Sequence, residues 1–98
     1  MCGIIGFTGN LQAPGILVDG LQQLEYRGYD SAGIAVNNGS ETQIVKTTGK
    51  VATLREKVAA TAGLEGTCGI GHTRWATHGG VTEVNAHPHV SGNVTLIH

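Results

Sequence analysis

The turn sequence Asn38-Gly39 places the strongest constraint on how this chain folds. Asn-Gly favours the tight two-residue turn of a β-hairpin, because both residues tolerate the positive φ angles that this turn requires. The residues before it, 32–37, and after it, 41–48, carry the apolar and β-branched side chains typical of strands. A hairpin at this point means that at least one strand pair is antiparallel, so a purely parallel sheet is excluded.

The rest of the chain alternates between strand-like and helix-like patterns. Leu17, Leu21 and Leu24 recur on one helical face, with Pro14 suited to the first turn and Gly28 placed to end the helix. We expect a second helix over residues 51–62, buried strands over 2–9 and 67–73, a loop over 74–89, and a last strand over 93–98. This order predicts a mixed or antiparallel arrangement in one domain or part of one. A chain that stops inside a strand indicates truncation.

The composition narrows the class of protein. Hydrophobic residues make up 40% of the 98 residues and charged residues 13%, which is typical of a globular chain. A net charge of −1 without a basic run argues against non-specific nucleic-acid binding. No apolar run is long enough for a membrane span, and the start lacks the basic region of a signal peptide. We therefore expect a cytoplasmic protein without a membrane partner, whose two cysteines are thiols.

Cys2 is the strongest candidate for a reacting group. Cysteine acts as its thiolate, a ready-made nucleophile. Removal of Met1 would leave a free α-amine, with an ordinary pKa of about 7.7–8.0, on the same residue as the thiol. Nucleophile and base would then be one residue, as in enzymes with an N-terminal threonine, and Gly3 would leave this end of the strand open to a substrate. The alternative is that Cys2 is a small buried side chain in a strand.

A second group of candidates lies in the loop after the strand at 67–73. Arg74 carries a planar fork of donors that is suited to gripping a carboxylate at two points. Trp75 is an amphipathic side chain that can exclude water, and Thr77 and His78 add short polar contacts. The alternative is an ordinary loop with a solvated arginine and a core-facing tryptophan.

Two further sets of polar residues have alternative explanations. Arg27 and Asp30 flank a glycine at a helix end, where they form a salt-bridged turn or line the same cleft as Cys2. Five histidines raise the possibility of zinc, and His87 and His89 are the closest pair. Neither a C-x-x-C motif nor H-x-x-x-H on a helix is present, so we predict no metal and expect the histidines to bind loop backbone.

Four stretches in order along the chain together resemble one known family. They are MCGIIG at the start, LEYRGYDSAG at 24–33, GHTRWATHG at 71–79 and VNAHPHV at 84–90. With this spacing the chain resembles the glutamine:fructose-6-phosphate amidotransferases, class II glutamine amidotransferases also called glucosamine-6-phosphate synthases. The alternative is the related phosphoribosylpyrophosphate amidotransferases. They share the Cys-Gly-Ile start and an Arg-Gly-x-x-x-Ala-Gly turn but lack the Trp-Ala-Thr-His and Asn-Ala-His-Pro-His stretches.

The resemblance implies a fold and a set of site residues. The expected fold is α+β, the αββα sandwich of N-terminal-nucleophile hydrolases, with residues 1–98 forming only its amino-terminal portion and the sugar-phosphate isomerase domains absent. Cys2 is expected to be the nucleophile and its freed amine the base, while Arg74 holds the glutamine α-carboxylate. Thr77 and His78 are expected in the same pocket, which the loop with Trp75 closes. Arg27 and Gly3 are expected to support the site.

The resemblance also implies an activity. Such an enzyme, a glutamine-fructose-6-phosphate transaminase (isomerizing), hydrolyses L-glutamine and passes the ammonia to fructose 6-phosphate, giving glucosamine 6-phosphate and glutamate. We expect no cofactor and, for the full-length enzyme, a homodimer. The family's oxyanion-hole residues follow His98, so the fragment itself is expected to be nearly inactive. The competing hypotheses are another N-terminal-nucleophile hydrolase without an acceptor domain, such as an asparaginase-like enzyme, and a small zinc-binding interaction module.

Overall fold

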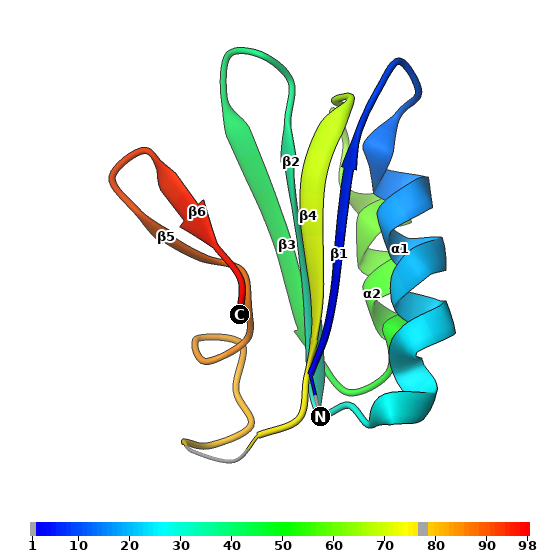
Figure 1. Ribbon diagram of the computed structural model, residues 1–98, viewed down its shortest axis with the longest axis vertical. Helices are drawn as coiled ribbons and strands as arrows, with labels where there is room; N and C mark the ends of the chain where they lie inside the picture. The colour runs from blue at the N-terminus through cyan, green and yellow to red at the C-terminus, as the bar shows by residue number, and fades with distance from the viewer. Residues whose placement is uncertain (1, 77–78) are drawn as a thin grey trace.

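The computed structural model describes residues 2–76 and 79–98, without the side chain of Arg27. Its elements in chain order are β1 (Gly3–Thr8), α1 (Ala13–Leu24), the 3-10 turn η1 (Glu25–Arg27), β2 (Ser31–Asn37), β3 (Thr42–Thr48), α2 (Val51–Ala60), β4 (Cys68–Arg74), β5 (His89–Ser91) and β6 (Val94–Leu96) (Figure 1). The two predicted helices and five predicted strands are confirmed.

The main sheet contains four strands in the order β1-β4-β2-β3, and every neighbouring pair is antiparallel. The predicted hairpin joins β2 to β3, but Asn37 pairs with Thr42, so its loop has four residues and not the two that Asn38-Gly39 favours. The Asn38 side chain accepts hydrogen bonds from the backbone N–H groups of Ser40 and Glu41, both at 2.9 Å. Gly39 adopts a φ of 96°, a conformation that favours glycine. A separate two-stranded sheet is formed by β5 and β6.

Both helices cover the same face of the main sheet, and the β5–β6 hairpin lies on the other side (Figure 1). The core lies between the helices and the sheet, where Leu17 and Leu21 of α1 are fully buried together with Ile34 of β2. Gly69 and Gly71 of β4 make this contact possible. A Cβ at Gly69 would lie 2.7 Å from Leu17 Cδ1, and one at Gly71 would lie 3.2 Å from Leu21 Cδ1.

Two sequence predictions about strands are wrong. The first strand is not buried, because β1 is at the edge of the sheet and its side chains alternate between covered and open sides, with Ile4 54% exposed. The strand β5 was not expected, because the predicted loop ended at residue 89 and the next predicted strand began at residue 93. It has only three residues, His89–Ser91, and pairs with β6 across the turn at Gly92, so it is too short to show a period of two.

The loop between β4 and β5 packs on the sheet face opposite the helices. Gly33 of β2 makes room for it, because a methyl group at that position would overlap the carbonyl oxygen of His87. Lys46 of β3 donates a hydrogen bond from Nζ to the Ala86 carbonyl at 2.9 Å. The loop is thereby held over one end of the sheet. No helix in residues 2–76 and 79–98 is long and apolar enough to cross a membrane.

Candidate active site

One end of the main sheet brings together the residues that the sequence singled out. The antiparallel register pairs Gly3 with Thr73 and Ser31 with Arg74, so the start of β1, the end of β4 and the start of β2 meet there. Thr73 faces the helices, since its Oγ1 lies 2.7 Å from where a Gly3 side chain would begin. Side chains alternate along a strand, so Arg74 and His72 face the opposite side.

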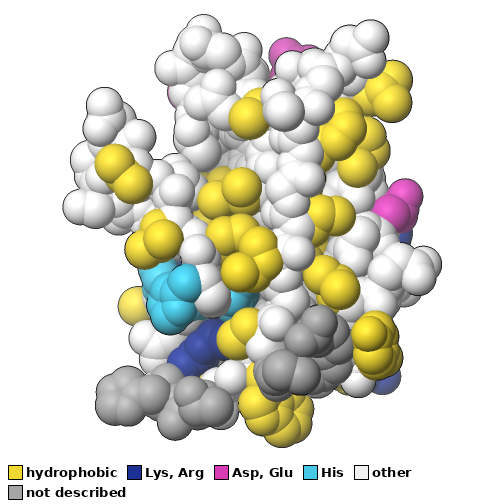
Figure 2. Space-filling model, viewed as in Figure 1, with side chains coloured by type: hydrophobic (Ala, Val, Ile, Leu, Met, Phe, Trp, Pro, Cys, Tyr) yellow, Lys and Arg dark blue, Asp and Glu magenta, His cyan; other side chains and the backbone are white. Residues whose placement is uncertain are grey.

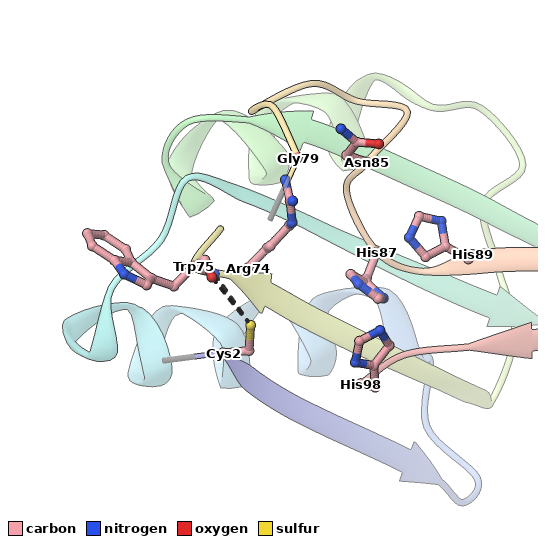
Figure 3. Close-up of a pocket in the computed structure, with 8 residues that line it drawn as sticks. All are labelled: Cys2, Arg74, Trp75, Gly79, Asn85, His87, His89 and His98. Atoms are coloured by element: carbon pink, nitrogen blue, oxygen red, sulfur yellow. Dashed lines mark hydrogen bonds between the residues drawn. The ribbon is translucent and has the colours of Figure 1, made fainter. Parts of the chain in front are cut away.

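A pocket of about 600 Å³ opens on that opposite side. Figure 3 shows the eight residues that line it: Cys2, Arg74, Trp75, Gly79, Asn85, His87, His89 and His98. Figure 2 shows histidine and basic side chains side by side on this face, next to an apolar area. The pocket therefore combines a thiol, a guanidinium group and imidazole rings.

Cys2 directly precedes β1 and presents an exposed thiol to the pocket. The backbone N–H of Trp75 donates to its Sγ at 3.4 Å, and the Sγ lies 3.9 Å from the Trp75 carbonyl oxygen (Figure 3). The other cysteine, Cys68, is also a free, exposed thiol, but it pairs in register with Thr8 at the opposite end of the same two strands. The predicted thiol state of both cysteines is confirmed, and only Cys2 lies at the pocket.

Arg74 extends into the pocket from the last position of β4 (Figure 3). Only 8% of the residue is exposed, so the solvated arginine of the alternative hypothesis is not observed. Its Nη1 donates to the Gly80 carbonyl at 3.0 Å and lies 4.0 Å from Oδ1 of Asp30. Asn85 donates to the same Gly80 carbonyl at 3.0 Å. The guanidinium group is therefore fixed between the sheet and the loop, and one side lines the pocket.

Trp75 contributes its backbone more than its ring. The indole is directed away from the other labelled side chains in Figure 3 and is half exposed. It packs on Gly28, whose added Cβ would lie 2.8 Å from the ring. Trp75 is thus neither the core-facing residue of the alternative hypothesis nor, in this structure, a cover over the thiol.

A cluster of histidine rings forms another wall of the pocket. The His87 ring centroid lies 4.2 Å from that of His72, 4.3 Å from that of His89 and 4.7 Å from that of His98. Burial, followed by the positive charge of its neighbours, lowers the pKa of His87 to about 4. Burial also lowers the pKa values of His72 and His89. The His87 ring is therefore neutral at pH 7.

The histidines only partly meet the expectation that they bind loop backbone. His72 Nε2 hydrogen bonds to the backbone carbonyl of His98, but the Nδ1 atoms of His72 and His87 are buried without a partner in the described residues. His87, His89 and Asn85 line the pocket although they were not predicted as site residues. The run His87-Pro88-His89 was the available signal, because a rigid proline between two histidines restricts where they point.

The remaining predicted site residues are only partly described. Met1, Thr77 and His78 lie outside the described residues, as does the side chain of Arg27, whose backbone ends η1. Gly3 faces the helices, where Thr73 and Leu24 occupy the space that a side chain would fill. Its observed role is therefore in packing. Among residues 2–76 and 79–98, no three His, Cys, Asp or Glu side chains are arranged to hold a metal ion.

The arrangement is suited to attack on a substrate that carries a carboxylate. The thiol is accessible, Arg74 lines the same pocket, and a backbone donor points at the sulfur. The Trp75 backbone contacts this sulfur through both an N–H donor and a carbonyl acceptor. The site thus contains a nucleophile and an anion-binding group in one pocket.

Comparison with known proteins gives several strong matches. No family model matches the chain. Glutamine--fructose-6-phosphate aminotransferase [isomerizing] from Streptococcus pneumoniae strain R6 is 62% identical over 91 residues, which is 93% of this chain and 15% of that protein. The proteins of the same name from Streptococcus pyogenes serotype M3 (MGAS315) and Streptococcus agalactiae serotype III (NEM316) are 55% and 56% identical over 100 residues. The chain spans about 15% of the length of these relatives and matches their amino-terminal part.

Two solved structures share the fold. The glutamine phosphoribosylpyrophosphate amidotransferase from Bacillus subtilis, complexed with ADP and GMP, has a TM-score of 0.77 at 26% identity and covers 97% of this chain and 20% of its own. A structure of the allosteric regulatory enzyme of purine biosynthesis has a TM-score of 0.76 at 30% identity, covering 90% of this chain and 18% of its own. The predicted N-terminal-nucleophile fold, of which the chain forms the amino-terminal portion, is confirmed.

Proposed function

The chain is homologous to the amino-terminal part of the glutamine--fructose-6-phosphate aminotransferases, and from this relationship we propose that it forms the glutamine-hydrolysing part of such an enzyme. One observation carries the proposal. The fold places the Cys2 thiol and the Arg74 guanidinium group, which are far apart in the sequence, in one pocket of about 600 Å³. We take residues 1–98 to be part of a glutaminase domain.

Arg74 is the proposed anchor for the substrate. The α-carboxylate of L-glutamine matches the planar fork of a guanidinium group, which binds two oxygens at once. Burial strengthens such a pair because less water competes for either charge. Thr77, His78 and Arg27 are proposed to complete or support this pocket, and the loop with Trp75 to close over bound glutamine.

Cys2 is the proposed nucleophile, with the α-amine freed by removal of Met1 as its base. The amine accepts the thiol proton, and the sulfur attacks the side-chain amide carbon of glutamine. The tetrahedral oxyanion collapses as the amine returns the proton to the leaving nitrogen, which departs as ammonia. Water then cleaves the γ-glutamyl thioester, giving glutamate and the free thiol.

We further propose that the ammonia serves fructose 6-phosphate at a separate domain of the full-length enzyme, giving glucosamine 6-phosphate, and that this enzyme is a cytoplasmic homodimer. The second candidate is the glutaminase part of a phosphoribosylpyrophosphate amidotransferase, supported by the two structural neighbours. Sequence identities of 55–62% with the aminotransferases, against 26–30% with those neighbours, favour the first.

The test is to replace Cys2 with alanine in the intact protein. Glutamate release from glutamine should fall to background, while amino-sugar synthesis from added ammonia should persist, because Cys2 acts only on the nitrogen donor. Cys68→Ala is the matched control, since this thiol lies at the far end of β4, and it should leave both activities unchanged. Intact-mass measurement should show Met1 absent from the active protein. Equal loss of both activities in Cys2→Ala would refute the assignment.

A further inference from the structure

Asp30 is a polar residue next to the site for which the proposed chemistry has no role. It precedes β2, and its side chain is 17% exposed beside an Arg74 side chain that is 9% exposed. Its backbone is fixed on both sides: its N–H donates to the Arg74 carbonyl at 2.7 Å, and its own carbonyl accepts from Gly49 N–H at 2.8 Å. The Ser31 hydroxyl donates to its Oδ1 at 3.0 Å. Asp30 is therefore rigidly placed.

The contacts of Asp30 fall on the two peptide groups that flank Trp75. Its N–H binds the carbonyl oxygen of the Arg74–Trp75 peptide. Its Oδ2 accepts the N–H of the Trp75–Ala76 peptide, contributed by Ala76. One residue thus holds one atom of each consecutive peptide group, the first through its backbone and the second through its carboxylate.

Cys2 contacts the other ends of the same two peptide groups. In a trans peptide the carbonyl oxygen and the N–H point in opposite directions. The N–H of the first group, contributed by Trp75, donates to Cys2 Sγ at 3.4 Å. The carbonyl of the second, also of Trp75, accepts a hydrogen bond from the same thiol at 3.9 Å. Asp30 and the Cys2 thiol therefore lie on opposite sides of one short segment.

We propose that Asp30 is a positioning residue that fixes both peptide groups of Trp75 against the Cys2 sulfur and thereby holds the thiol in its orientation at the pocket. The inference deepens the proposed function, since it takes Cys2 as the nucleophile. Asp30 acts in two ways: it restricts rotation of the backbone at Trp75, and its charge strengthens the hydrogen bond that does so. The carboxylate fixes the second peptide plane, which restricts rotation of Trp75 and keeps the first plane in its donating orientation. A charge-assisted hydrogen bond is about twice as strong as a neutral one, so the carboxylate holds this plane better than an amide.

The test measures the reactivity of the thiol without glutamine. The intact protein with Met1 removed is treated with iodoacetamide, and peptide mass mapping gives the alkylation rates of Cys2 and Cys68 separately. Both thiols are exposed, so Cys68 serves as an internal reference in every sample. The variants are Asp30→Ala, which removes the acceptor, and Asp30→Asn, which keeps an uncharged one. Asp19→Ala is the matched control, because Asp19 forms only an exposed pair with Arg55 on the helix side.

We expect the Cys2-to-Cys68 rate ratio to fall about tenfold in Asp30→Ala and about threefold in Asp30→Asn, as loss or weakening of one hydrogen bond predicts. Asp19→Ala should leave the ratio unchanged. For glutamate release, kcat should fall in the same order, with a smaller change in KM. Partial recovery in Asp30→Asn separates this role from general destabilisation, which would instead change the Cys68 rate.

An unchanged ratio in either Asp30 variant that folds would overturn the positioning role. If Asp30→Ala does not fold, Asp30→Asn decides alone. The outcome is independent of the proposed function, because alkylation needs neither glutamine nor turnover. A wild-type protein that releases no glutamate would refute the glutaminase assignment and leave the alkylation ratio interpretable.

Discussion

Lowering the pH from 7 to 5 should destabilise the protein through the buried ring of His87. This ring is 6% exposed and contacts the rings of His72, His89 and His98. Arg74 and Lys46 add positive charge to the cluster. A proton on His87 would place a charge on a largely buried side chain that faces other cationic or titratable groups, so the folded state resists protonation.

The sign and size of the change in the free energy of unfolding follow from the two pKa values of His87. The pKa is about 4 in the folded state and about 6.5 in the unfolded chain. As the pH falls through 6.5, the unfolded chain binds the proton first, so the free energy of unfolding decreases until about pH 4. The full effect is about 3 kcal/mol, of which about 2 kcal/mol is lost between pH 7 and pH 5. His72 and His89 change stability in the same direction, because their pKa values are also lowered.

The assay is urea unfolding of wild type and His87→Asn at pH 7 and pH 5. Asparagine cannot titrate in this range, so the variant should lose at least about 1 kcal/mol less than wild type between the two pH values. The comparison uses the difference between pH values, which cancels the cost of the smaller side chain. Equal pH dependence in the two proteins would refute the account of a buried neutral His87.

Two further predictions test the substrate anchor and the packing of the loop. Arg74→Lys should raise the KM for glutamine about tenfold or more, because an ammonium group cannot reproduce the bidentate fork; an unchanged KM would contradict the carboxylate-binding role. Gly33→Ala should lower the free energy of unfolding by about 1–3 kcal/mol, since the added methyl group overlaps the His87 carbonyl. Gly15→Ala is the matched control, because nothing lies within 4 Å of its added Cβ and alanine favours helix α1, so it should be neutral or stabilising. Equal losses from both substitutions would show that the loop contact is not responsible.

The sequence predicted the positions of the long elements because their signals are local. The leucine spacing of α1 and the Asn38-Gly39 turn each depend on residues that are close together in the sequence. Burial of β1 was predicted wrongly, because burial depends on the place of a strand in the sheet. With β1 at the edge, Ile4 has no neighbouring layer on its outer side in this chain and is 54% exposed.

The candidate site was predictable as a set of residues but not as a geometry. Cys2 and Arg74 were named from their chemistry, and the register that places them together, Gly3 opposite Thr73, is set by pairing between strands far apart in the sequence. For Asp30 the sequence left two roles open, a salt-bridged turn or a place at the same cleft, and its use of two peptide groups could not be read from side-chain types. Those contacts involve the backbone of residues 74–76, which the sequence does not distinguish from any other loop.

The alternation of side chains along β4 indicates which side of the sheet holds the core and which side holds the candidate site. Gly69 and Gly71 face the helices, because larger side chains there would collide with Leu17 and Leu21 of α1. The alternate residues of β4 therefore face the other way, and they include the polar pair His72 and Arg74. A strand that presents small residues to one layer and buried cationic or titratable groups to the other has its core on the first side. Buried polar groups lower the stability of the fold unless they are bound to partners. The side of the strand that carries them is therefore the candidate place for chemistry. Arg74 has such partners in Gly80 and Asp30, whereas His72 and His87 each keep one buried nitrogen without a partner in the described residues. These two nitrogen atoms belong to the histidine cluster beside the Cys2 pocket. A buried nitrogen without a hydrogen-bond partner lowers the stability of the fold, and such a cost is typical of functional sites.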